Sequence, residues 1–141
     1  MKRGIKFRAW HKVYERYLYD VQNAYDTLSG CVKDENGEDA GYDEECFAGF
    51  LDNDRYVVEQ YTGLHDKNGR EIYEGDVIVT HPKSKYEAPK SGVVQFGDSC
   101  PSFIYKVKDG SEYDIWSSNV FRTYEVIGNI FENRELLEGK Q

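Results

Sequence analysis

The sequence predicts an all-β protein, and three observations lead to that expectation. The 141 residues include 12 Tyr and 7 Phe, and aromatic and β-branched residues favour strands over helices. Several short segments alternate apolar and polar residues with the two-residue period of a half-buried strand. Turn signals of the Asn-Gly and Asp-Gly type separate several of those segments. A chain of this length can form one domain with its own hydrophobic core.

The first sixty residues are expected to form a β-hairpin arm followed by an acidic loop. Apolar residues alternate with polar ones over residues 5–10 and again over residues 17–21, and the short connection between them indicates a hairpin. Residues 22–33 are compatible with a short helix or with a loop. The following segment, KDENGEDAGYDEE at 33–45, has almost nothing to bury and predicts a mobile loop.

The remainder is expected to hold short strands joined by tight turns. Lys67-Asn68-Gly69-Arg70 and Gly75-Asp76 predict two turns, because Asn and Gly accept positive φ, and Asp109-Gly110 predicts a hairpin. A bulge is expected near Gly128-Asn129. Strands are expected at residues 55–61, 77–80, 93–96, 102–108, 111–116 and 124–131, and one helical turn at 132–138. We therefore divide the chain into residues 1–60 and a small barrel or sandwich at 61–141.

Charge and cysteine content limit the classes of function. The net charge is −8, which disfavours generic binding to nucleic acid or to anionic membranes. Residues 1–16 carry six basic side chains and one acidic one, whereas residues 34–54 carry nine acidic and no basic ones. The basic arm is either solvated or contacts an acidic surface, in this chain or a neighbour. Three cysteines without a CxxC pair, no signal peptide and no apolar run long enough to span a membrane predict a cytoplasmic protein.

Three segments, near the start, the middle and the end of the chain, resemble the YopX family: IKFRAW, QYTGLHDKNGREIYEGDVIV and YEVIGNIFENRELL. That family is encoded mainly by bacteriophages and prophages of Gram-positive bacteria and has no established biochemical role. The resemblance implies an SH3-like β-barrel for the carboxy-terminal portion and a phage or prophage accessory protein in a bacterial host cell. It implies no catalytic residues, and fold alone does not give function.

The central segment, residues 61–79, concentrates polar groups on two turns and has two interpretations. In the structural one, the glycines permit the turns, the acids cap backbone N–H groups, and Arg70 pairs with a nearby carboxylate. In the functional one, the segment is a binding rim made by Tyr61, Arg70, Glu71, Tyr73, Glu74 and Asp76. An enzyme would need a pocket gathering His65, Asp66 and Asp76. Because nucleophile motifs, phosphate-binding loops and closely spaced Cys and His are missing, we expect no enzyme, no metal and no cofactor.

The leading hypothesis is therefore a non-catalytic module that contacts a host or phage protein, or a second copy of itself. The alternative is single-stranded nucleic-acid binding through the loop at residues 81–92. That loop gathers cations with one aromatic ring: Lys83, Lys85, Tyr86 and Lys90. Tyr105, Tyr113 and Trp116 on expected strands could add a stacking face. Against this alternative, residues 61–141 carry thirteen acids and ten bases.

Overall fold

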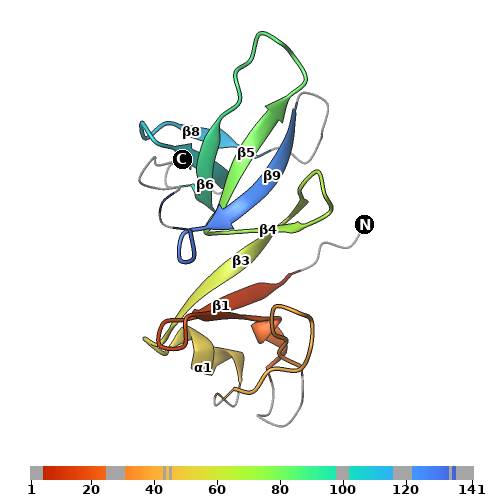
Figure 1. Ribbon diagram of the computed structural model, residues 1–141. Coiled ribbons are helices and arrows are strands. Elements are labelled where there is room, and N and C mark those ends of the chain that lie inside the picture. The colour runs from red at the N-terminus through yellow and green to blue at the C-terminus, as the bar shows by residue number, and fades with distance from the viewer. Residues whose placement is uncertain are drawn as a thin grey trace. The chain divides into compact units, whose positions relative to one another are not determined.

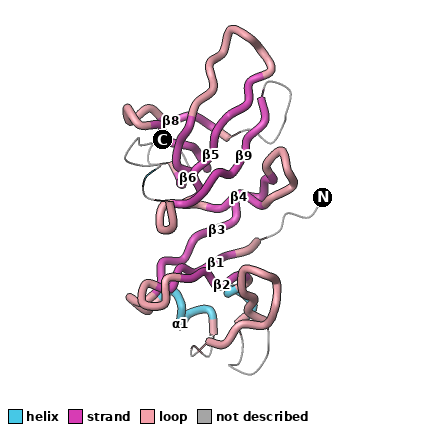
Figure 2. The backbone as a smooth tube through the Cα atoms, in the orientation of Figure 1, coloured by secondary structure: helices cyan, strands magenta, loops and turns pink. Residues whose placement is uncertain are grey.

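The computed structural model describes residues 5–24, 31–42, 44, 46–97, 102–115, 122–133 and 135 of the chain. The chain divides into two compact units, Met1–Tyr61 and Thr62–Gln141. In the described residues, Figures 1 and 2 show antiparallel strands with one short α-helix. The predicted all-β class is confirmed.

The first unit is built on the predicted hairpin. Strand β1 (Phe7–His11) pairs with β2 (Arg16–Tyr19) and, on its other side, with β3 (Tyr56–His65). The sheet order is β2-β1-β3-β4, and β3 continues into the second unit, where β4 (Glu71–Tyr73) is its neighbour. The 3-10 turn η1 (Val21–Asn23) and helix α1 (Phe47–Leu51) complete this unit. Its core consists of Ala9, Leu18, Val21, Ala24, Val32, Tyr42, Phe50 and Tyr56.

Strand β1 differs from the expected half-buried strand, because both its faces are buried. Ala9 packs into the core of the first unit, yet Arg8 on the opposite face is also only 2% exposed. Arg8 Nε donates a hydrogen bond of 2.9 Å to Glu59 Oε1, and the Tyr17 hydroxyl donates one of 2.9 Å to the same oxygen. A charged side chain can be buried when it is paired and hydrogen-bonded. One residue of the basic arm thus meets an acid of this chain.

The acidic segment also differs from the expected loop with nothing to bury. Tyr42 belongs to the core of the first unit, and Val32 beside the segment is fully buried. Asp34 Oδ1 accepts the backbone N–H groups of Asn36 and Glu38, at 2.8 and 3.0 Å. A short polar side chain can organise a turn in this way, so the described part of the segment is a folded turn anchored by apolar neighbours.

The second unit contains a five-stranded antiparallel sheet. Its strands are β5 (Asp76–Pro82), β6 (Ser91–Phe96), β7 (Phe103–Val107), β8 (Glu112–Asp114) and β9 (Arg122–Asn129), in the order β8-β7-β6-β5-β9. Figure 1 shows that this sheet is curled. Its core consists of Ile72, Ile78, Val94, Tyr105, Tyr124 and Val126. The SH3-like barrel stays a prediction, as the curled sheet alone does not establish it.

The turns of this unit follow the sequence signals closely. Gly69, Gly75 and Gly110 have φ of +83°, +84° and +94° at the three predicted turns, a region that only glycine enters without strain. The expected bulge lies one residue earlier than predicted. The β5–β9 register passes from Val77 opposite Gly128 to Ile78 opposite Val126, which leaves Ile127 as the extra residue. Most of the expected helical turn at 132–138 lies outside the described residues.

Candidate functional site

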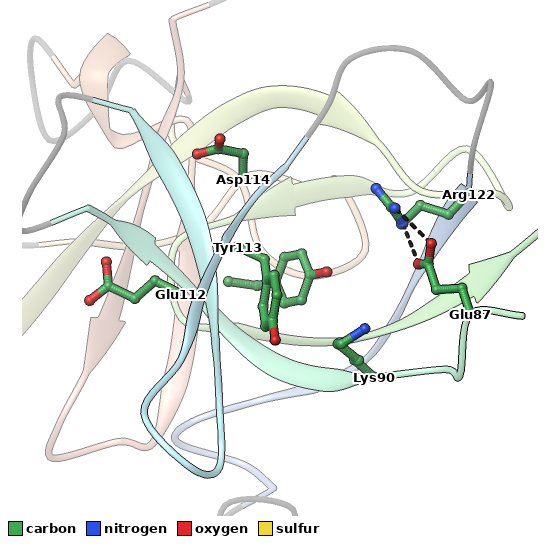
Figure 3. A pocket seen from close by; sticks show the side chains of 7 residues that line it. Glu87, Lys90, Glu112, Tyr113, Asp114 and Arg122 are labelled. Carbon is green, nitrogen blue, oxygen red and sulfur yellow. Dashed lines mark hydrogen bonds and ion pairs between the residues drawn. The ribbon is translucent and has the colours of Figure 1, made fainter.

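A cleft of about 390 Å³ lies in the second unit, and we call it the tyrosine cleft (Figure 3). Its lining comes from β7, from the loop between β5 and β6, and from β8 and β9, the two edge strands of the sheet. The lining residues are Glu87, Lys90, Tyr105, Glu112, Tyr113, Asp114 and Arg122. The volume is in the range of known ligand and side-chain pockets.

Two tyrosines form the aromatic part of the cleft. Tyr105 on β7 lies directly opposite Tyr113 on β8 in the strand register, so both rings project from the same face of the sheet. The rings stack with centroids 5.4 Å apart and an interplanar angle of 25°. Tyr105 is 3% exposed and also contacts Tyr124 edge-on, whereas Tyr113 is 38% exposed. The cleft therefore has an ordered inner ring and an accessible outer ring.

The hydroxyl of Tyr105 is a hydrogen-bonding group without a partner among the described residues. Every fully buried side-chain polar atom in that part of the chain does have a partner, so this hydroxyl must be reached from the cleft that Tyr105 lines. Burial raises the pKa of Tyr105 to about 12. The side chain is therefore a neutral phenol near pH 7, able to donate one hydrogen bond.

Arg122 and Glu87 form a bidentate ion pair in the cleft. Arg122 Nε and Nη2 donate hydrogen bonds of 2.7 and 2.9 Å to the two carboxylate oxygens of Glu87 (Figure 3). Such a bidentate pair constrains direction as well as distance, so it holds the β5–β6 loop against β9. The bond raises the pKa of Arg122 and lowers the pKa of Glu87, so both groups are charged at neutral pH.

Lys90 places a second cation beside this pair. Its ammonium lies 5.2 Å from the centre of the Tyr113 ring, within the range of a cation–π interaction. The positive charge of Lys90 also lowers the pKa of Glu87. Its backbone is anchored to Thr80, whose hydroxyl oxygen accepts the Lys90 N–H at 2.8 Å and whose own N–H donates to the Lys90 carbonyl at 2.8 Å. The side chain can therefore be changed without removing the anchor.

The charges of the cleft are divided between two sides. Glu87 is the one carboxylate beside the two cations Lys90 and Arg122, and it is paired with Arg122, which leaves one surplus positive charge on their side. Glu112 and Asp114 on β8 are both exposed. Figure 3 shows their carboxylates on the other side of Tyr113, directed away from Lys90 and Arg122. The cleft thus combines a cationic side, an aromatic wall and an acidic rim.

The predicted binding rim of the central segment is largely occupied with its own structure. Of its six members, Tyr61, Tyr73 and Asp76 are buried, Glu71 and Glu74 are half-buried, and Arg70 is exposed. Asp76 Oδ2 accepts the Tyr73 N–H at 2.8 Å, and Glu71 accepts the Tyr73 hydroxyl at 3.2 Å. Arg70 was expected to pair with a nearby carboxylate, but it makes no ion pair with the described residues. That this segment binds a partner stays a prediction.

Asp66 is the structural centre of the same segment. It is 7% exposed, and its Oδ1 accepts the N–H groups of Asn68 and Arg70, each at 2.9 Å, while Oδ2 accepts the Val126 N–H of β9 at 3.0 Å. Burial acts to raise the Asp66 pKa, but the three N–H donors outweigh it, and the pKa lies below its usual value. Asp66 and Asp76 thus both cap backbone groups, as the structural interpretation predicts. Within the described ranges, no three His, Cys, Asp or Glu side chains are grouped to hold a metal ion.

The residues of the nucleic-acid hypothesis are only partly brought together. Lys90 meets the tyrosine pair, whereas Lys83 and Lys85 are exposed and do not line the cleft. Lys85 Nζ lies 5.4 Å from the centre of the ring of Tyr86, which is 89% exposed. Trp116 lies outside the described residues.

Sequence reasoning did not identify the Arg122–Glu87 pair or the carboxylates of Glu112 and Asp114. Arg122 and Glu87 are 35 residues apart, so no local pattern could have joined them. The two acids flank Tyr113 on a short strand next to an Asp-Gly turn, where charged residues are common and carry no specific signal.

Comparisons with known proteins agree on one family. The YopX protein family model matches residues 6–138. The chain is 32% identical to protein EF1440 from Enterococcus faecalis, with a TM-score of 0.61, over 96% of this chain and 99% of that one. It is 22% identical to protein yopX from Bacillus subtilis, with a TM-score of 0.55, over 94% and 97% of the two chains, which shows likeness of fold. The search of curated proteins found no match. The chain belongs to the YopX family.

Proposed function

We propose that this YopX-family protein is a non-catalytic module that binds another protein, and that the tyrosine cleft is its working surface. The observation that carries the proposal is the cleft itself, which joins the accessible ring of Tyr113 to a hydroxyl and a lysine that have no hydrogen-bond or ion-pair partner among the described residues. Tyrosines supply large contact area at small entropic cost and are enriched where proteins bind each other.

The proposed setting is the cytoplasm of a bacterial host, with a partner of host or phage origin. The low and odd cysteine content supports a reducing compartment. In the described part of the chain, no helix has the length and apolar character needed to cross a bilayer. Asp66 and Asp76 of the central segment accept backbone N–H groups, so they give no support to a catalytic role there.

The test is selection of binding partners on the full-length protein and on two variants. Tyr113→Ala removes the accessible ring of the cleft, and Tyr14→Ala removes an exposed tyrosine of the first unit as the control. We expect proteins displayed from host and phage genomes to be retained by wild type and Tyr14→Ala and to be lost by Tyr113→Ala. Light scattering at micromolar concentration shows whether the partner is a second copy. Partners that bind Tyr113→Ala as well as wild type would refute the cleft as the working surface.

Single-stranded nucleic-acid binding is the second candidate, and it is favoured by the two cation–π contacts Lys85–Tyr86 and Lys90–Tyr113. Ring stacking with nearby cations is how small barrels hold single strands. Three carboxylates line the same cleft and oppose a phosphate backbone. This candidate predicts salt-sensitive binding that weakens when Lys83, Lys85 and Lys90 are all changed to Ala. Binding that is absent at low salt, or unaffected by the triple change, would eliminate it.

A further inference from the structure

We infer that the tyrosine cleft binds one carboxylate of the partner polypeptide, from an aspartate or glutamate side chain, between Lys90 and the Tyr105 hydroxyl. This inference rests on the proposed function and specifies the chemistry of the group that enters the cleft.

The first argument is the surplus of hydrogen-bond donors. The Lys90 ammonium lies 5.2 Å from the centre of the Tyr113 ring and interacts electrostatically with Glu87, but it makes no ion pair with the described residues. The Tyr105 hydroxyl, on a side chain that is 3% exposed, is likewise without a partner among them. Because this hydroxyl is open to water through the cleft, a bound acceptor would take the place of water as its hydrogen-bond partner. Both groups line the same cleft, and a carboxylate accepts from both.

The second argument is charge. Glu87 is bound by Arg122 through both of its oxygens, so it compensates one of the two cations beside it and not the other. One incoming negative charge would bring this side of the cleft to neutrality. Because the pKa of Tyr105 is about 12, its hydroxyl stays protonated and donates to that charge instead of repelling it.

The third argument concerns the source of the carboxylate. The exposed acids Glu112 and Asp114 flank the cleft, and they repel a chain of phosphates far more than a single carboxylate among neutral or basic neighbours. These acids lie on β8, the last strand of its sheet in the described order. A strand at a sheet edge can pair with an extended peptide, which would lay side chains beside the cleft. A polypeptide therefore fits better than nucleic acid.

The experiment is selection of random twelve-residue peptides from a display library on the full-length protein, followed by affinity measurement with the synthetic peptides. We expect an Asp or Glu to recur in the selected peptides, and its replacement by Asn or Gln to weaken binding about tenfold. On the protein side, Lys90→Met should weaken binding about tenfold. Lys108→Met, which removes an exposed lysine outside the cleft lining, should leave affinity unchanged.

Two further variants separate a binding role from a structural one. Tyr105→Phe removes only the unpartnered hydroxyl, so it should weaken peptide binding about two- to tenfold while the unfolding midpoint at pH 7 stays unchanged. The double change Glu112→Gln and Asp114→Asn should strengthen binding about two- to fivefold by removing repulsion. Glu35→Gln with Glu38→Gln removes two exposed charges of the first unit and should have no effect.

Selected peptides or affinity changes opposite to those expected would overturn the inference. Recurrent Lys or Arg in the selected peptides, or tighter binding by Lys90→Met, would assign the cleft to a cationic group. Binding of oligothymidine that falls equally with Lys83→Ala and Lys90→Ala would assign it to nucleic acid. Peptides that depend on Tyr113 but carry no carboxylate would refute this inference and leave the proposed function standing, whereas failure to select any peptide or protein would refute both.

Discussion

Replacing Asp66 by alanine should destabilise the second unit by about 3–4 kcal/mol. The carboxylate accepts three backbone N–H groups, two in the turn between β3 and β4 and one on β9. Hydrogen bonds to a charged group contribute about 1.5–3 kcal/mol each when both partners are buried. Asn68 and Arg70 are exposed, so water can replace their bonds. The N–H of Val126 is buried and would be left unpaired, so it carries most of the cost.

The loss can be measured by urea unfolding and, more locally, by hydrogen exchange of the Val126 amide, which should lose most of its protection. Because folding lowers the Asp66 pKa, the unfolded chain binds the proton first as the pH falls. The contribution of Asp66 is therefore fully present above about pH 4 and declines below it.

Asp66→Asn keeps one acceptor oxygen, so we expect a smaller loss of about 1–2 kcal/mol and a flatter acid dependence than in the wild type. An Asp66→Ala variant within about 0.5 kcal/mol of wild type, with Val126 still protected, would show that this carboxylate does not hold β9 to the turn.

Three further predictions address other parts of the chain. The unfolding free energy should fall by about 1–2 kcal/mol between about pH 10 and pH 12 through Tyr105, whose raised pKa makes the unfolded chain lose its proton first, and Tyr105→Phe should show less of this fall. Gly92→Ala would place a Cβ 2.8 Å from a backbone carbonyl of β7 and should cost about 1–3 kcal/mol in thermal or urea unfolding, whereas Gly41→Ala, with open space around it, should be near neutral. Arg8→Ala should cost about 3–5 kcal/mol by leaving the buried Glu59 without its ion pair, and changing both residues to Met should recover much of the loss in the same assay.

The parts of the fold that were predicted correctly are those set by local backbone chemistry. The Asn68-Gly69 and Asp109-Gly110 turns need positive φ at a glycine, and the structure has it at both glycines. Such a requirement can be recognised from a few adjacent residues in the sequence. The first hairpin follows from a two-residue period on either side of a short connection, which is equally local.

The predictions of burial were wrong where the burial of a residue depends on contacts with residues distant in the sequence. Arg8 has the sequence context of a solvated side chain, and only Glu59, 51 positions away, makes its burial possible. Similarly, the acidic segment was expected to lack buried residues because its composition is polar. Tyr42, with Ala40 beside it, attaches the segment to the core of the first unit.

The candidate site shows the same division between local and distant information. Sequence reasoning named Lys90, Tyr105 and Tyr113, because each is of a residue type that commonly contributes to binding sites. It combined Lys90 with Lys83 and Lys85 as a basic loop, which suggested phosphate binding. In the folded unit, Glu87 pairs with Arg122 and interacts only electrostatically with Lys90, and the neighbouring lysines do not line the cleft. The resulting single surplus charge is a property of three residues from two separate segments. The cleft thus offers one surplus positive charge beside one neutral hydroxyl, whereas the sequence suggested a row of lysines. A site of this kind favours a single carboxylate over a polyanion.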